Sequence, residues 1–231
     1  MKQAGVSLLV KQIMAGEATR PRNPTVYSPF KRLIDVVFSF IGLIVLLPVF
    51  IIMAVWVKMD SPGPVLFHQI RMTRGMTPFF TLKFRTMRIS YDEYDNQGIT
   101  SSDKQSRITK SGHFLRKYRF DELPQLLNVL IGDMSLVGPR PQTPRYVEAY
   151  PQVYREILTI RPGLTGLASI RFHETEERMI AAAGDRADEV YINKILPLKF
   201  RYNLFYVHNY NFLFDMKIIW WTFYGMWKKR K

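Results

Sequence analysis

The pattern of hydrophobic and polar positions singles out one segment near the N-terminus. Residues 36–57 contain no charged side chain. About 20 apolar residues are enough for a helix to cross the hydrocarbon core of a bilayer. Pro48 lies inside this run, where it removes one backbone hydrogen bond and crowds the preceding turn. The pattern therefore predicts a long apolar helix that is kinked at Leu47–Pro48.

Three arrangements of this helix are compatible with the residues alone. It could cross the membrane once, enter and return on the same side as a re-entrant helix, or lie buried in a soluble core. Basic residues mark the cytoplasmic side of a membrane segment. Here Lys31 and Arg32 precede the run and Lys58 follows it. Basic residues at both ends mildly favour the re-entrant arrangement, and the length argues against a soluble core helix.

The remaining elements are shorter. Apolar runs bounded by turn residues predict strands at residues 65–69 and 78–84 around a turn at 73–76, followed by a polar loop at 90–105. Helices are predicted at residues 114–118 and 124–131, from about Tyr146 onward, and over 174–210 with an interruption at Pro197, and a turn is predicted at 161–166. The expected architecture is α+β and mostly helical, with a small β-hairpin.

The C-terminal segment combines aromatic and basic side chains. Trp220, Trp221 and Trp227 lie in residues 212–227, and residues 228–231 are all basic. Such a helix is typical of one that lies in the headgroup region of an anionic membrane. A core helix with a solvated basic end is the alternative.

Composition narrows the choice of partners. The chain has 33 Lys and Arg against 19 Asp and Glu, a formal net charge of +14, which favours an anionic partner: nucleic acid, acidic lipid or a phosphorylated substrate. Nucleic acid is disfavoured because the aromatic residues lie in apolar runs. The absence of cysteine excludes disulfides, a zinc–thiolate site and a cysteine nucleophile, and the four histidines show no metal-ligand spacing.

Two adjacent carboxylates, Asp121 and Glu122, follow the basic residues of 116–119. Asp121 could simply cap a helix that has Pro124 in its first turn. A chemical role is compatible with that position, because neighbouring arginines would keep Asp121 ionised and able to attack phosphorus. Glu122 could bind Mg²⁺, which uses one or two carboxylates together with substrate phosphates.

Other basic residues could contact phosphate groups. Arg140 lies between Pro139 and Pro141, so a stiff loop presents a guanidinium group, which is suited to bidentate binding of phosphate. Lys83, Arg85 and Arg161 lie beside predicted strand ends or turns. Each of these positions taken alone is equally compatible with an ordinary exposed turn.

Several segments in series resemble the bacterial sugar transferase family, the monotopic phosphoglycosyl transferases. The resemblance runs from about Lys31 to the C-terminus. Besides the apolar helix broken by a proline, the matching segments are residues 31–35 (KRLID), 61–64 (SPGP), 83–87 (KFRTM), 121–125 (DELPQ), 128–130 (NVL), 132–135 (GDMS), 137–141 (VGPRP) and 161–166 (RPGLTG).

The resemblance implies a domain order and a location. Residues 1–30 would be an N-terminal extension, 31–59 a re-entrant membrane helix, and 60–231 a catalytic domain with interfacial helices. The protein would be monotopic, with its globular unit on the cytoplasmic face of the bacterial inner membrane. Its implied partners are a nucleotide sugar, polyprenyl phosphate and anionic lipid but no nucleic acid, and a homodimer is left open.

The resemblance also implies a reaction. Asp121 would attack the phosphate that bears the sugar of a UDP-sugar, release UMP, and hold the sugar phosphate until undecaprenyl phosphate accepts it. This step initiates lipid-linked glycan or exopolysaccharide assembly. Glu122 would bind Mg²⁺, Arg116 and Arg140 match basic residues near phosphate, and Lys83, Arg85 and Arg161 match further phosphate-binding positions.

Two alternative functions remain open, and this chain differs from the usual family pattern at two of its segments. A glycosyl transferase would release UDP instead, and a non-catalytic basic adaptor would only bind the membrane surface. The family often has Ser-Pro at the helix break, where this chain has Leu47-Pro48. Residues 168–170 read Ala-Ser-Ile where many members have Ala-Gln-Val, which leaves the sugar and base specificity open.

Overall fold

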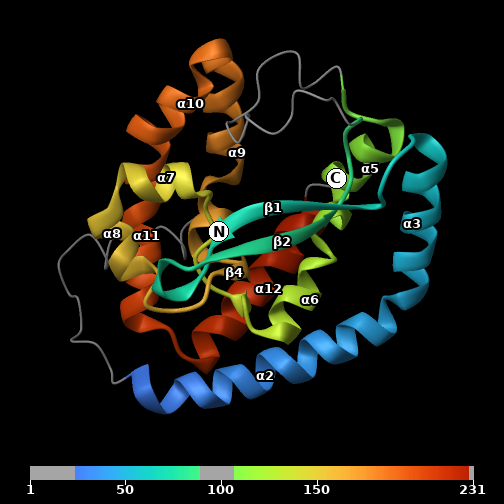
Figure 1. Cartoon of the computed structure of the whole chain (residues 1–231). Coiled ribbons are helices and arrows are strands. Elements are labelled where there is room, and N and C mark those ends of the chain that lie inside the picture. Colours follow the sequence, from blue (N-terminus) through green and yellow to red (C-terminus); the bar gives the residue numbers. More distant parts are fainter. Residues whose placement is uncertain (1–23, 89–106, 229–231) are drawn as a thin grey trace.

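The computed structural model describes residues 24–88 and 107–228 (Figure 1). The polar loop predicted at 90–105 and most of the N-terminal extension lie outside these ranges. Helices α2 (Pro24–Val45) and α3 (Leu47–Asp60) form the apolar segment and are bent by 62° relative to each other. Neither helix alone has the length and apolar composition to cross a membrane, whereas the bent pair meets both criteria when taken together.

The bend lies at Leu46, next to the predicted kink. Leu46 links the two helices, and Pro48 occupies the first turn of α3. A proline is tolerated there because the first N–H groups of a helix have no acceptor within the helix. In Figure 1, α2 runs along the bottom of the molecule and α3 rises along its right side.

Both helices expose much of their apolar surface. Val45, Ile52 and Met59 are 68%, 60% and 81% exposed. Other exposed apolar side chains on the pair are Phe30, Leu33, Val37, Phe38, Phe40, Ile41, Ile44, Leu47, Ile51, Val55 and Trp56. A soluble protein rarely leaves an apolar patch of this size uncovered.

The opposite side of α2 is tied to the globular unit by polar contacts. Arg32 donates from Nη1 to the Val129 carbonyl (2.6 Å) and from Nη2 to the Leu130 carbonyl (2.7 Å), near the C-terminal end of α6 (Gln125–Ile131). Asp35 is buried and accepts a hydrogen bond from the Leu136 amide at 3.0 Å. Helix α2 therefore supplies partners for backbone groups of the globular unit.

The predicted β-hairpin is confirmed. Strands β1 (Leu66–Met72) and β2 (Pro78–Phe84) pair antiparallel, with the 3₁₀ turn η1 (Arg74–Met76) between them. Gln69 pairs with Thr81, and Lys83 pairs with Phe67. Because paired residues and alternate residues share one face of a sheet, Gln69, Arg71 and Lys83 project from the same face.

A second pair of strands was not predicted. Strand β3 (Ser135–Val137) pairs in parallel with β4 (Gly163–Thr165), so the turn predicted at 161–166 is wrong over its central residues. The two segments approach closely because glycines face each other. A Cβ atom on Gly163 would lie 2.0 Å from the Gly138 nitrogen, a distance that no side chain could occupy.

The other elements are helical, which confirms an α+β, mostly helical architecture. They are α5 (Lys110–Tyr118), η3 (Phe120–Glu122), α6, α7 (Pro144–Ala149), α8 (Pro151–Ile157), α9 (Leu167–Ala183), η4 (Gly184–Arg186), α10 (Ala187–Val190), the π-helical turn η5 (Tyr191–Ile195), α11 (Leu196–Asn209) and α12 (Phe212–Lys228). The interruption predicted at Pro197 lies instead at Gly184, which has a φ of +54°, and Pro197 lies in the first turn of α11.

Two buried clusters hold these helices together. Tyr146, Ile157 and Leu196 belong to one that joins α7, α8 and α11. Tyr206 of α11, Ile218 of α12 and Val137 of β3 belong to the other. The Tyr206 hydroxyl donates to the Val137 carbonyl at 3.1 Å, which fixes the end of β3 that leads to Arg140.

Candidate active site

Asp121 and Glu122 lie in the short turn η3 between α5 and α6. Helix α5 ends at Tyr118, and the left-handed backbone of the next residue, Arg119 (φ 58°), redirects the chain into this turn. Helix α6 begins only at Gln125, with Pro124 at its N-cap. The alternative in which Asp121 caps the helix is therefore wrong, and both carboxylates remain available for other contacts.

Glu122 is buried and held by cations. Its Oε1 accepts from Lys83 Nζ at 3.0 Å and from Arg140 Nη2 at 2.5 Å. Its Oε2 has weaker contacts, with Arg140 Nη1 at 3.3 Å and Arg119 Nη1 at 4.0 Å. Burial alone would raise the pKa of Glu122, but the charges of Arg140 and Lys83 outweigh it and hold the pKa well below its usual value.

Asp121 differs sharply from its neighbour. Among the described residues it accepts no hydrogen bond and forms no ion pair. Burial, and then the negative charge of Glu122, raise its pKa, although Lys83, Arg116 and Arg140 act in the opposite direction. The neighbouring cations thus favour the ionised form of Asp121, as expected, but burial and the charge of Glu122 oppose them.

The predicted phosphate-binding residues fall into two groups. Lys83 and Arg140 contact Glu122, and Arg116 lies close enough to Asp121 for the two charges to interact. Arg116 also donates from Nε to Thr86 Oγ1 at 2.8 Å, which fixes its side chain. Together with Asp121 and Glu122, these three cations form what we call the dyad cluster.

Arg85 and Arg161 lie elsewhere. Arg85 is buried and donates to the Ser61 carbonyl at 2.7 Å and to the Pro62 carbonyl, so it fastens the end of α3. Arg161 donates from Nε to the Gly132 carbonyl at 2.7 Å and lines a separate cavity. The structure therefore does not bring these two arginines into the dyad cluster.

Arg71 lies beside the dyad cluster, although it was not among the predicted phosphate-binding residues. It donates from Nη2 to Gln69 Oε1 at 2.7 Å and from Nη1 to the Pro141 carbonyl at 3.1 Å. Burial, and then the charge of Arg140, lower its pKa to about 10. The alternation of strand residues could have revealed Arg71, because it shares a hairpin face with Lys83.

The Arg140 loop is fixed by β4. The Gly138 amide donates to the Thr165 carbonyl at 2.9 Å, and the Gly163 amide donates to the Pro139 carbonyl at 2.8 Å. These bonds hold the backbone on both sides of Pro139 and leave the Arg140 side chain to reach Glu122. The cluster thus combines one fixed carboxylate, one carboxylate that has no partner in the described part of the chain, and several cations that suit a phosphorylated ligand.

Comparison of the sequence with known proteins identifies a family. The model of the bacterial sugar transferase family matches residues 26–229. The chain is 36% identical over 196 residues to a UDP-glucose:undecaprenyl-phosphate glucose-1-phosphate transferase of Klebsiella pneumoniae, covering 84% of this chain and 39% of that protein. It is 38% identical over 201 residues to the exopolysaccharide production protein PSS of Rhizobium leguminosarum bv. phaseoli, covering 83% of this chain and 92% of that protein.

A third relative has a different sugar in its name. The UDP-N-acetylgalactosamine-undecaprenyl-phosphate N-acetylgalactosaminephosphotransferase of Aeromonas hydrophila is 34% identical over 199 residues, covering 84% of this chain and 43% of that protein. The chain therefore spans about two fifths of the Klebsiella and Aeromonas relatives and most of the Rhizobium one. On the family match and these identities, this chain belongs to the bacterial sugar transferase family.

Proposed function

We propose that this protein transfers a sugar 1-phosphate from a nucleoside diphosphate sugar, such as a UDP-sugar, to polyprenyl phosphate and releases the nucleoside monophosphate. The observation that carries the proposal is the contrast within the dyad: Glu122 is held by two cations, whereas Asp121 has no partner among the described residues. The relatives named as undecaprenyl-phosphate sugar-phosphate transferases support the same reaction class.

In the first step, a carboxylate oxygen of Asp121 attacks the phosphorus that bears the sugar. The pyrophosphate P–O bond on the nucleotide side breaks, and the nucleoside monophosphate leaves with that bonding pair. Arg116 and Lys83, whose charges act on Asp121, would balance charge on the phosphate oxygens. Because the pKa of Asp121 is raised, its carboxylate is more basic than an ordinary aspartate and a better nucleophile.

In the second step, a phosphate oxygen of polyprenyl phosphate attacks the same phosphorus. The bond between phosphorus and Asp121 breaks and restores the carboxylate, so the lipid leaves with the sugar attached through a pyrophosphate. Two successive displacements at one residue predict ping-pong kinetics. Glu122 would hold Lys83 and Arg140 in place throughout.

The proposal includes Mg²⁺, and the donor set suits it. No group of three or more acidic or histidine side chains within residues 24–88 and 107–228 could hold a metal. Mg²⁺ needs less, since it binds through one or two carboxylates together with substrate phosphates. Oε2 of Glu122, which has only the weaker contacts, would hold it together with the substrate phosphates. When bound, the ion would offset negative charge on the phosphoryl oxygens.

The proposed location is the cytoplasmic face of the bacterial inner membrane, with α2 and α3 as a re-entrant hairpin. Their exposed apolar side chains and 62° bend support this arrangement. Helix α12 would lie at the interface, because Trp220 and Phe223 are 70% and 64% exposed while Ile218 on the same helix is fully buried. Polyprenyl phosphate would then reach the dyad from the membrane and the nucleotide sugar from water.

The nucleotide that is released separates this reaction from its alternative. The full chain, incubated in detergent with a UDP-sugar, undecaprenyl phosphate and Mg²⁺, is expected to produce UMP because the pyrophosphate linkage is cut. Release of UDP instead would identify a simple sugar transfer and contradict the proposal. Formation of neither nucleotide with any of several UDP-sugars would favour the non-catalytic adaptor.

A second experiment tests the covalent step. Intact-protein mass spectrometry after incubation with the UDP-sugar alone is expected to show a mass increase of one sugar phosphate, because no acceptor is present to remove it. Peptide mapping should place the adduct on Asp121. An adduct that persists in Asp121→Asn, or turnover without any adduct under rapid quenching, would contradict this step.

A further inference from the structure

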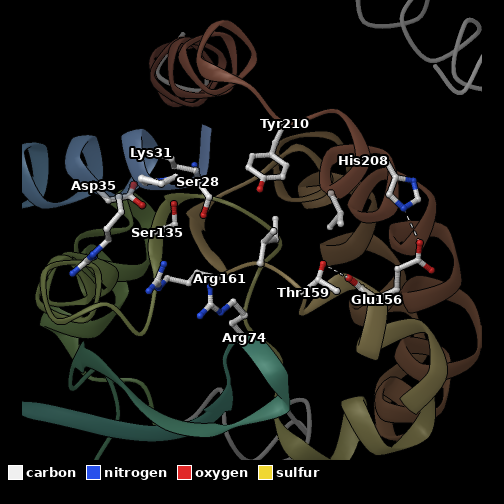
Figure 2. Close-up of a pocket in the computed structure, with 14 residues that line it drawn as sticks. Ser28, Lys31, Asp35, Arg74, Ser135, Glu156, Thr159, Arg161, His208 and Tyr210 are labelled. Carbon is white, nitrogen blue, oxygen red and sulfur yellow. Dashed lines mark hydrogen bonds and ion pairs between the residues drawn. The ribbon is translucent and has the colours of Figure 1, made fainter. Parts of the chain in front are cut away.

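A cavity separate from the dyad cluster lies where α2 meets the hairpin turn and the segment before β4 (Figure 2). Its volume is about 660 Å³. Ser28, Lys31 and Asp35 of α2 line one side, Arg74 of η1 and Arg161 line another, and the cavity includes none of the side chains that contact Glu122 in the described chain.

Two guanidinium groups share one side of this cavity. Figure 2 shows the side chains of Arg74 and Arg161 next to each other. Among the described residues, Arg161 donates only through Nε, to the Gly132 carbonyl, and Arg74 forms no hydrogen bond or ion pair. Burial, and then the charges of Arg74 and Arg32, lower the pKa of Arg161. The cavity therefore holds concentrated positive charge with unused donors.

The other charged side chains that line the cavity are engaged by the protein itself. Their partners are Asp215 for Lys31, the carbonyl groups of α6 for Arg32, the Leu136 amide for Asp35 and His208 for Glu156. The Glu156–His208 pair lies on the side of the cavity away from Asp35 in Figure 2. An anion that enters between Arg74 and Arg161 thus meets donors that no carboxylate occupies.

Apolar side chains surround the same end of the molecule. Phe30 and Leu33 of α2 are 51% and 59% exposed, and Leu213 at the start of α12 is 69% exposed. The rings of Phe30 and Phe212 contact each other with centroids 5.9 Å apart, which joins the two helices beside the cavity. Exposed apolar groups next to a basic cavity are the arrangement expected where hydrocarbon gives way to lipid headgroups.

We propose that this cavity binds the phosphate group of an anionic membrane phospholipid, with Arg74 and Arg161 as its hydrogen-bond donors. Guanidinium groups bind phosphate oxygens in pairs, so two of them on one wall match a single headgroup phosphate. The bound lipid would fix the end of α2 that lies nearest the hairpin turn. This assignment rests on the proposed membrane location but not on the chemistry at Asp121.

Arg74→Gln tests the site, because Arg74 is exposed on the hairpin turn and makes no contact on which folding depends. The control is Arg186→Gln, which removes the same charge from the exposed turn η4. Native mass spectrometry of the full chain in neutral detergent would titrate phosphatidylglycerol and, separately, phosphatidylethanolamine. We expect one retained phosphatidylglycerol, bound about tenfold more weakly by Arg74→Gln and unchanged in Arg186→Gln.

Parallel measurements distinguish the sources of phosphate and the ways in which the proposal could fail. Equal weakening by both substitutions would mean general charge attraction and overturn the site. Thermal stabilisation by inorganic phosphate that depends on Arg74, without lipid retention, would assign the site to a water-soluble ligand instead. Failure of the protein to float with vesicles of any composition would refute the membrane location. UMP release measured on the same samples tests the reaction proposed at Asp121 and Glu122 separately.

Discussion

Asp121→Asn is expected to reduce turnover by about four to six orders of magnitude, the loss typical of removing a nucleophile from an enzyme. The amide has nearly the same shape as the carboxyl group but cannot form the acyl phosphate. UMP release under single-turnover conditions would measure the loss. A reduction of less than about tenfold would show that the reaction does not pass through a bond to Asp121.

The same substitution should leave the folded state at least as stable as before. Because the folded state raises the pKa of Asp121, ionisation of this group destabilises the fold at pH values above that pKa. Asparagine removes both the buried charge and the repulsion with Glu122, so the thermal unfolding temperature at pH 7 should stay the same or rise. Asp185→Asn, in the exposed turn η4, is the control that should change neither turnover nor stability.

Glu122→Gln should have the opposite effect on stability. It leaves Lys83 and Arg140 without their buried carboxylate, and breaking a buried ion pair by removing one partner costs about 3–5 kcal/mol. Denaturant unfolding in detergent at pH 7 would measure the loss. Glu189→Gln, on the exposed surface of α10, is the matched control and should change the free energy of unfolding by less than about 0.5 kcal/mol.

The destabilisation should also depend on pH in a defined direction. A carboxyl group whose pKa is lowered on folding contributes stability that is fully present above its unfolded pKa and is lost as pH falls through its folded pKa. For Glu122 the loss should therefore begin below the usual value of 4.5. A difference between the wild type and Glu122→Gln that stays constant at lower pH would show that packing, not charge, accounts for the effect.

Local sequence patterns predicted the elements whose formation depends on nearby residues. The hairpin follows from two apolar runs around a turn, and the α2–α3 bend follows from Pro48 within an uncharged run. Strands β3 and β4 were missed because each has only three residues and their pairing depends on the close approach of Gly138 and Gly163. The sequence contains those glycines, but not the contact between them.

The sequence could predict the part of the site that adjacent residues form. It could not predict the part that depends on the direction in which side chains point. Asp121 and Glu122 are neighbours in any fold, so their pairing was evident. Lys83 and Arg85 look equivalent in the sequence, yet Lys83 contacts Glu122 while Arg85 lies past the end of β2 and donates to carbonyl groups beyond α3. Which way a basic side chain points is set by tertiary contacts, and these also direct Arg161 into a separate cavity.

The hydrogen bonds of α2 limit how this protein can be truncated or combined with parts of other proteins. Arg32 occupies the last carbonyl groups of α6, and Asp35 occupies the amide of Leu136. Cutting the chain after α3 to obtain a water-soluble fragment would leave these carbonyl and amide groups without their partners. It would also remove the helix that packs against α6 and β3. The apolar helix α2 is thus a structural part of the catalytic unit, and a chimaeric protein that exchanges it must also supply these hydrogen-bond partners.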